Sequence, residues 1–153
     1  FNQIKLTGTV PITDPRMTRF MISLEQGVEL VWDAFEDMTG GEIYVKKIPS
    51  MKITDLAFAV APDAKQEIIG IRPGEKLHEQ MIGEEDAAST YLYGNYYKIF
   101  PVINGWDSDP LRIKNGIKVP DDFVYSSETN SEWMTRAELI AWLEDNHHKI
   151  GRI

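Results

Sequence analysis

The sequence predicts a mixed α/β fold. Two stretches, residues 24–38 and 136–148, carry apolar residues at helical intervals, and each follows a Ser or Thr with Gln or Glu three positions later. That spacing is typical of a capped helix start. Around these stretches, short apolar or alternating runs are bounded by Pro and Gly, which is typical of strands. The chain has 153 residues, 42% of them hydrophobic, and is long enough to bury a core of modest size.

Four elements are predicted before the glycine pair at residues 40–41: an edge strand or entering loop at 5–9, a turn-rich connector at 11–15, a short strand at 20–22 and a helix at 24–38. The helix is the most clearly marked of them, because Ser23 and Gln26 have the capping-box spacing. Its apolar residues recur at helical intervals: Leu24, Val28, Val31, Trp32 and Phe35.

The middle of the chain is predicted to alternate strands and helices: a strand at 42–47, a helix at 54–61, a buried strand at 68–71 and a helix at 75–82. Thr54 is the candidate cap of the first helix, which Pro62 ends. The run of residues 68–71 is apolar throughout, and Pro73-Gly74 is a turn that stops it before the second helix begins.

The remaining elements are a further helical turn at 84–88, a strand at 96–102, loops and hairpins over 103–131, and a final helix from Thr135 to His148. A connector as long as 103–131 is unusual inside a compact domain, so we expect an arm that wraps its own lobe or a neighbouring subunit. Four tyrosines are expected on a sheet face: Tyr91, Tyr93, Tyr96 and Tyr97. His147 and His148 are expected at the helical carbonyls, since no third ligand is spaced to join them on a metal.

A candidate binding motif lies at the turn after the predicted strand 68–71. Arg72 offers a fork of donors suited to phosphate oxygens, and Glu75 can accept hydrogen bonds from vicinal hydroxyls of a ribose or sugar. The spacing alone also fits a solvated turn with an Arg–Glu ion pair. His78 is expected to make a supporting hydrogen bond rather than to act as an acid or base.

A second candidate is the segment 14–19, where two arginines lie three residues apart. Arg19 could point to a ligand while Arg16 pairs with Asp14 or with solvent, although a purely structural ion pair fits the spacing as well. Met17 could pack on a base or sugar. Asp14 is expected to orient an arginine rather than to act as a base.

Residues 71–79, Ile-Arg-Pro-Gly-Glu-Lys-Leu-His-Glu, resemble the signature of bacterial UDP-N-acetylglucosamine 4,6-dehydratases of the inverting, 5-epimerising kind. These enzymes belong to the extended short-chain dehydrogenase/reductase superfamily. Further blocks are similar in the same order along the chain: residues 11–20, 25–27, 41–57 and 125–133. The resemblance implies that Arg19, Arg72 and Glu75 contact the UDP group directly, with Arg16 and Met17 as second choices.

Two family features are missing from the sequence. None of its eleven glycines forms Gly-x-Gly-x-x-Gly, and none of its six tyrosines has a lysine four residues later. The resemblance therefore implies a C-terminal, substrate-binding half without catalytic residues, whose parent enzyme binds NADP through the half that is missing here. Three parts are predicted: a nucleotide-sugar-binding lobe at 1–102, a loop- and hairpin-rich arm at 103–132 and a C-terminal helix at 133–153.

Charge and composition limit the partners. The net charge is −8, with −2 in residues 1–76 and −6 in residues 77–153, so an anion site is expected in the first half. The acidity argues against nucleic acid. No run of 18 apolar residues suggests a membrane span, and the absence of cysteine excludes thiolate metal sites. We expect a cytoplasmic protein that binds a UDP-sugar, holds no metal and forms a homo-oligomer through the face left by the missing half.

Two other functions remain open at this point. One is a non-catalytic nucleotide-sugar-binding or assembly module. The other is a family member that retains the C5 configuration and whose parent is membrane-bound.

Overall fold

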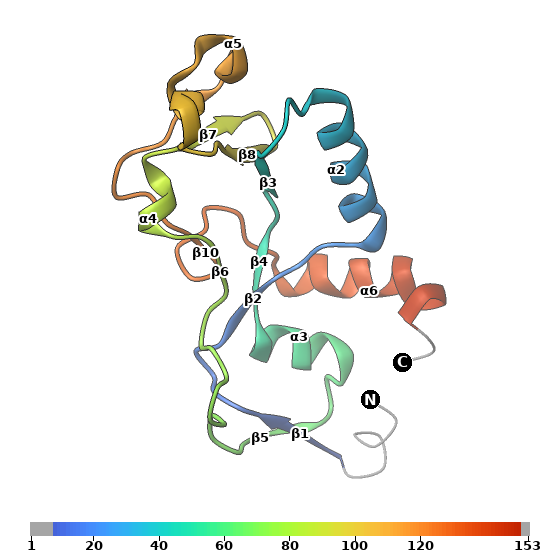
Figure 1. Ribbon diagram of the computed structural model, residues 1–153. Helices are drawn as coiled ribbons and strands as arrows, with labels where there is room; N and C mark the ends of the chain where they lie inside the picture. The colour runs from blue at the N-terminus through green and yellow to red at the C-terminus, as the bar shows by residue number, and fades with distance from the viewer. Residues whose placement is uncertain (1–7, 151–153) are drawn as a thin grey trace. The chain divides into compact units, whose positions relative to one another are not determined.

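The computed structural model describes residues 8–150, and side chains up to residue 146. The chain contains both helices and strands, interspersed along its length, which confirms the predicted mixed α/β class (Figure 1). The chain forms two compact units: one contains the segment up to Met21, Pro49–Glu79 and the segment from Asn130, and the other contains Ile22–Ile48 and Gln80–Thr129. The functional division into residues 1–102, 103–132 and 133–153 stays a prediction.

Among the described residues, the first unit contains six elements: β1 (Thr9–Ile12), β2 (Thr18–Phe20), β4 (Ser50–Lys52), α3 (Ile53–Val60), β5 (Lys65–Ile68) and α6 (Arg136–Ile150). β1 pairs with β5 in parallel, and β2 pairs with β4 in antiparallel register. α3 lies beside α6 and contacts β1 (Figure 1). A small core forms between them from Val10, Ile12 and Ala57.

The second unit is built on a four-stranded antiparallel sheet in the order β3 (Ile43–Lys46), β8 (Tyr96–Ile99), β7 (Thr90–Tyr93) and β9 (Ile117–Lys118). α2 (Leu24–Asp37) contacts β3. A separate antiparallel pair joins β6 (Gln80–Ile82) and β10 (Tyr125–Ser126). The short helical segments are α4 (Glu84–Ala87), the 3-10 segment η1 (Ile103–Ser108) and α5 (Pro110–Ile113).

The aromatic residues of β7 and β8 lie on both faces of this sheet. Tyr93 and Tyr96 stack with ring centroids 5.4 Å apart on one face, where the Nζ of Lys98 lies 4.4 Å from the Tyr93 ring centroid. On the other face the ring of Tyr97 lies 5.2 Å from that of Tyr125. Because successive residues of a strand point to opposite faces, Tyr97 lies on the opposite face from Tyr96. The tyrosines belong to the sheet, but the prediction of a single face is wrong for Tyr97.

Both predicted capping boxes are confirmed. The Gln26 N–H donates to Ser23 Oγ at 3.2 Å, and the Ser23 N–H donates to Gln26 Oε1 at 3.0 Å. At the start of α6 the Thr135 N–H donates to Glu138 Oε2 at 2.7 Å, and the Glu138 N–H donates to Thr135 Oγ1 at 3.3 Å. The predicted strands 42–47 and 96–102 correspond to β3 and β8, and the helical turn 84–88 corresponds to α4.

Two predictions around the binding motif are wrong. The buried strand expected at 68–71 is replaced by β5, which lies earlier in the chain and ends before Gly70, whose φ of 86° is unsuited to a strand. The residues of β5 are exposed, not buried. No helix forms over 75–82, where turns lead into the strand β6. The carbonyls of Lys76 and Leu77 accept hydrogen bonds from Arg19, 57 and 58 residues away, so they do not support a helical ladder.

Three other predictions need correction. The strand expected at 20–22 is β2, which ends at Phe20. Thr54 does not cap α3: its N-cap residue is Lys52, whose side chain has no acceptor and makes no cap bond. The Ile53 N–H donates instead to the Met17 carbonyl at 3.0 Å. The segment 103–131 is not only loops and hairpins, since it contains η1 and α5. Residues 5–7 of the first predicted strand and the side chains of His147 and His148 lie outside the described part.

Candidate functional site

All five predicted UDP-binding residues lie in the first unit, on two neighbouring segments. Arg16, Met17 and Arg19 precede or belong to β2, and Arg72 and Glu75 lie in the loop that follows β5. The Thr18 N–H donates to the Leu77 carbonyl at 3.1 Å, which fixes this loop beside β2. The tertiary structure therefore brings the two sequence motifs, more than 50 residues apart, next to each other.

Arg19 connects the two segments. One guanidinium nitrogen, Nη1, donates to the carbonyls of Thr18 at 2.7 Å and Leu77 at 3.1 Å; the other, Nη2, donates to the Lys76 carbonyl at 2.9 Å and lies 3.2 Å from Met17 Sδ. Its Nε lies 3.3 Å from Glu79 Oε1. The side chain is 25% exposed. Arg19 thus holds residues 76–79 against β2, and Met17, which is buried, packs beneath its guanidinium.

Arg72 and Glu75 close a turn. The Glu75 N–H donates to the Arg72 carbonyl at 3.1 Å, and the Arg72 N–H donates to Glu75 Oε2 at 3.2 Å. Gly74 between them has a φ of 85°, a conformation that favours glycine. Both side chains are exposed. The Glu75 carboxylate therefore binds the backbone of Arg72 and not its guanidinium. The guanidinium is not needed to hold the turn.

Arg16 pairs with Asp14, one of the alternatives open from the sequence. Its Nε and Nη2 donate to the two carboxylate oxygens at 3.0 and 2.8 Å, and its N–H donates to Oδ1 at 2.8 Å. These hydrogen bonds from Arg16 lower the pKa of Asp14 to about 2. Asp14 is therefore ionised at neutral pH and orients the arginine, as the sequence predicted, instead of acting as a base.

Two residues at the end of the motif, His78 and Glu79, contact the segment that contains β2. His78 Nδ1 lies 2.7 Å from Thr18 Oγ1, which confirms the predicted supporting hydrogen bond. Glu79, the ion-pair partner of Arg19, was not singled out. The sequence around Glu79 does not predict its contact with Arg19, because Arg19 lies 60 residues away in the chain.

The site has several cations that are suited to binding an anion. Arg16, Arg72 and Lys76 are exposed cations on the two joined segments. No cluster of three His, Cys, Asp or Glu side chains in the described residues could hold a metal ion. The longer helices begin after Ser23, Lys52 and Thr135, none of them behind a Gly-x-Gly-x-x-Gly turn. The described residues therefore do not form a dinucleotide site of that type.

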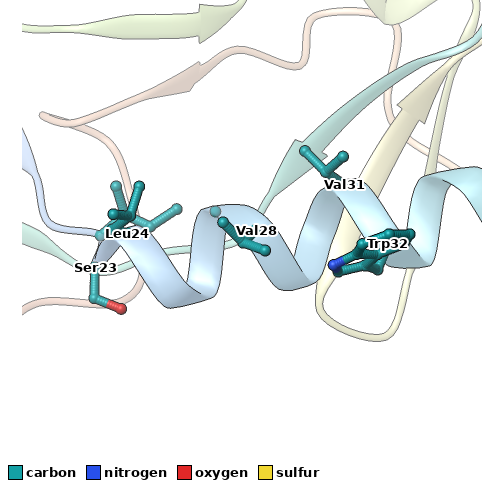
Figure 2. Close-up of a pocket in the computed structure, with 7 residues that line it drawn as sticks. Ser23, Leu24, Val28, Val31 and Trp32 are labelled. Atoms are coloured by element: carbon teal, nitrogen blue, oxygen red, sulfur yellow. The ribbon is translucent and has the colours of Figure 1, made fainter.

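The second unit has an apolar groove along α2. The groove has a volume of about 550 Å³ and is lined by one polar residue and six apolar ones or glycine: Ser23, Ile22, Leu24, Gly27, Val28, Val31 and Trp32. Figure 2 shows the side chains of Leu24, Val28, Val31 and Trp32 projecting from successive turns of the helix. A groove lined in this way lacks the polar groups that would orient a nucleotide-sugar.

Comparisons with known proteins agree with the motif resemblance. Residues 1–101 match the family described as "Polysaccharide biosynthesis protein". The chain is 54% identical over 136 residues to a UDP-N-acetylglucosamine 4,6-dehydratase (inverting) of Campylobacter jejuni, covering 86% of this chain and 41% of that protein. It is 43% identical over 102 residues to a UDP-glucose 4-epimerase of Rickettsia bellii, covering 64% and 30%. The chain thus spans less than half the length of these relatives.

A solved structure, Pen from Bacillus thuringiensis, matches 95% of this chain and 44% of its own with a TM-score of 0.78 at 24% identity. This likeness shows the fold alone, and it agrees with the predicted mixed α/β class. Within residues 8–150, no helix has both the length and the hydrophobicity to cross a bilayer. The match over residues 1–101, more than half of the sequence, shows that the chain belongs to the polysaccharide biosynthesis protein family.

Proposed function

We propose that this chain is the C-terminal, UDP-sugar-binding portion of a longer UDP-N-acetylglucosamine 4,6-dehydratase of the inverting kind. The observation that carries the proposal is the 54% identity to such an enzyme over 136 residues. The geometry of the first unit supports it independently, since two cation-bearing segments are joined there into one exposed surface.

In this proposal Arg72 and Glu75 make the direct contacts with the UDP group. The turn that joins them is closed by backbone bonds and by the Glu75 carboxylate, so the Arg72 guanidinium can bind a phosphate as a fork while the turn stays intact. Glu75 Oε2 accepts from the Arg72 N–H, and the other carboxylate oxygen can accept from a ribose hydroxyl. Both side chains are exposed and accessible to a ligand.

In this proposal Arg19 holds the loop in place and also offers its Nε to the ligand. Its Nη donors hold residues 76–79, whereas its Nε faces the Glu79 carboxylate, which is 43% exposed. A diphosphate could replace that carboxylate at Nε while the carbonyl bonds remain. Met17 Sδ lies against the same guanidinium and would support it, and Arg16, exposed and held by Asp14, would add to the positive potential.

The parent reaction would oxidise C4 of the hexose, eliminate water across C5–C6 and return the hydride to C6, with inversion at C5. NADP, bound by the part of the protein outside this chain, would supply the hydride-accepting and hydride-donating chemistry. This chain would orient the UDP group and thereby place the sugar for that reaction. The parent would be a lyase of the cytoplasm and a homo-oligomer, and the 153-residue chain alone would be inactive.

A second candidate is a UDP-sugar 4-epimerase, favoured by the 43% identity over 102 residues to the Rickettsia bellii enzyme. Both reactions begin from a UDP-hexose, so a UDP-binding surface serves either. The lower identity and shorter match make it the weaker candidate.

Incubation of the full-length parent with UDP-N-acetylglucosamine separates the candidates. A 4,6-dehydratase releases a product lighter than the substrate by one water, a 4-epimerase releases an isomer of unchanged mass, and a non-catalytic module releases none. Mass spectrometry of the sugar nucleotides distinguishes the three. An isomer without loss of water would contradict the proposed function.

A further inference from the structure

We propose that the exposed apolar face of α2, formed by Leu24, Val28, Val31, Trp32 and Phe35, docks against the part of the parent polypeptide that lies outside this chain. The inference rests on the proposed function, which makes the chain a portion of a longer enzyme. It assigns the place where that longer polypeptide covers the second unit.

The α2 apolar face is exposed along the whole helix. Leu24 is 80% exposed, and Trp32 and Phe35 are each 64% exposed. None of the 14 residues of α2 is buried. Scattered apolar residues are normal on a surface, but five large ones on one side of one helix form a contiguous patch of the kind that marks an interaction site.

The patch is separate from the side by which α2 packs on its own unit. The half-buried residues of the helix, which face that unit, are Gly27, Leu30, Ala34 and Asp37. At about 100° per residue, the five apolar residues cluster about a third of a turn from that side. The third side of the helix carries only acids and is formed by Glu25, Glu29, Asp33 and Glu36. The helix therefore has an inward, an acidic and an apolar side.

The apolar side is not required to hold α2 in place. The helix begins at the Ser23–Gln26 capping box, and near its end Asp37 forms ion pairs with Lys98 and Lys114 of the same unit. Both anchors use polar groups that lie away from the apolar face. The five large residues of this face are each at least 46% exposed. Four of them line the groove of about 550 Å³ in Figure 2: Leu24, Val28, Val31 and Trp32.

The size of the relatives and the charge of α2 favour one occupant. The Campylobacter dehydratase extends well beyond the 41% of its length that this chain matches, so the proposed parent contains a large surface not present here. The helix carries five Asp and Glu residues and no Lys or Arg. A twofold antiparallel pairing of α2 with a second copy would bring two acidic sides together, which is unfavourable. The occupant that fits is an apolar surface flanked by Lys or Arg.

Cysteine labelling of the full-length parent tests the docking. The 153-residue sequence contains no cysteine, so a single introduced thiol can be followed once cysteines elsewhere in the parent are replaced by serine. Val31→Cys places the thiol on the apolar face, and Asp33→Cys, on the acidic side of the same helix, is the matched control. Val28→Cys is a second probe of the face, for the case that the first variant does not fold. The measured quantity is the rate of reaction with a maleimide.

We expect the Val31→Cys thiol to react about tenfold or more slowly in the parent than in the 153-residue chain, because a covered thiol reacts only after local opening. The Asp33→Cys thiol should react equally fast in both. Equal rates for Val31→Cys in both proteins would overturn the docking. So would protection in the parent that is lost when the parent is diluted, since the occupant would then be a second copy.

The water-loss assay on the same parent keeps the two proposals distinguishable. Loss of water together with a freely reacting Val31→Cys thiol would leave the proposed function standing and remove the docking. A protected thiol in a parent without dehydratase activity would leave the docking standing and remove the proposed function.

Discussion

Replacement of Asp37 by Asn should destabilise the second unit selectively. Asp37 lies at the end of α2 and binds three partners: the Nζ of Lys98, the Nζ of Lys114 at 2.8 Å and the Tyr44 hydroxyl at 2.9 Å. The Lys98 side chain is only 3% exposed. The Asn variant keeps the shape of the side chain but leaves a buried ammonium without its anion.

The magnitude follows from the pKa of Asp37. Burial raises this pKa, but the hydrogen bonds from Lys114, Lys98 and Tyr44 outweigh burial and lower it from 3.8 to about 2. A carboxyl whose pKa is lower in the folded state stabilises the fold above its ordinary pKa. The shift corresponds to about 2 kcal/mol, since one pKa unit is about 1.4 kcal/mol. Because the buried Lys98 retains only the nearby aromatic faces, we expect a loss of about 2–3 kcal/mol at pH 7.

The assay is native-state hydrogen exchange as a function of urea, read in peptides that cover β8, so that it reports the second unit. Asp33→Asn is the matched control, because Asp33 is exposed on the same helix; it should change the free energy of unfolding by less than about 0.5 kcal/mol. In the unsubstituted chain the contribution of Asp37 to stability should disappear as the pH falls from about 4 to about 2. The difference in the free energy of unfolding between this chain and the Asp37→Asn variant should therefore become smaller over that range. An equal effect of the two substitutions at pH 7, or a gap that is constant with pH, would refute the reasoning.

Three further predictions concern the site. In the full-length parent, Arg72→Ala should weaken UDP binding by about 1.5–3 kcal/mol and leave NADP binding unchanged, because it removes charge-assisted hydrogen bonds to phosphate. The control is Lys65→Ala, which removes an exposed cation on β5 and should not change UDP binding. If calorimetry finds that Arg72→Ala binds UDP as tightly as wild type, the site assignment is wrong. Glu75→Gln should cost less UDP affinity and discriminate less against 2′-deoxy-UDP in the same titrations. The 153-residue chain with NADP and UDP-N-acetylglucosamine should form no 4-keto sugar by mass spectrometry, and steady product formation would show that catalytic residues are present in it.

Local patterns in the sequence were enough for several elements. The helix starts at Ser23 and Thr135 depend on bonds between residues three positions apart, so the spacing in the sequence contains both partners. The strands β3 and β8 likewise follow from short alternating or apolar runs. The pairing of Arg16 with Asp14 was among the expected alternatives for the same reason, since the two residues are neighbours in the chain.

Long-range contacts decided the shape of the candidate site. The residues after Gly74 have good local features for a helix, yet their carbonyls bind Arg19 and the Thr18 N–H from a strand far away in the sequence. No periodicity within residues 75–82 contains that information, and the predicted helix was therefore wrong. Through these contacts Arg19 holds residues 76–79 in place, a role that the residues next to it in the sequence did not indicate.

Local sequence was enough for the family, for the motif at residues 71–79 and for the amphipathic character of α2, because each is carried by residues close together in the chain. Two features depend on contacts between distant residues and are visible only in the folded chain: the loop at 72–79 lies beside β2, and the apolar side of α2 is exposed while its Leu30 side is half-buried. Periodicity shows that a helix has an apolar side, but it does not show what covers that side. Burial depends on partners that are distant in the sequence or belong to another part of the protein.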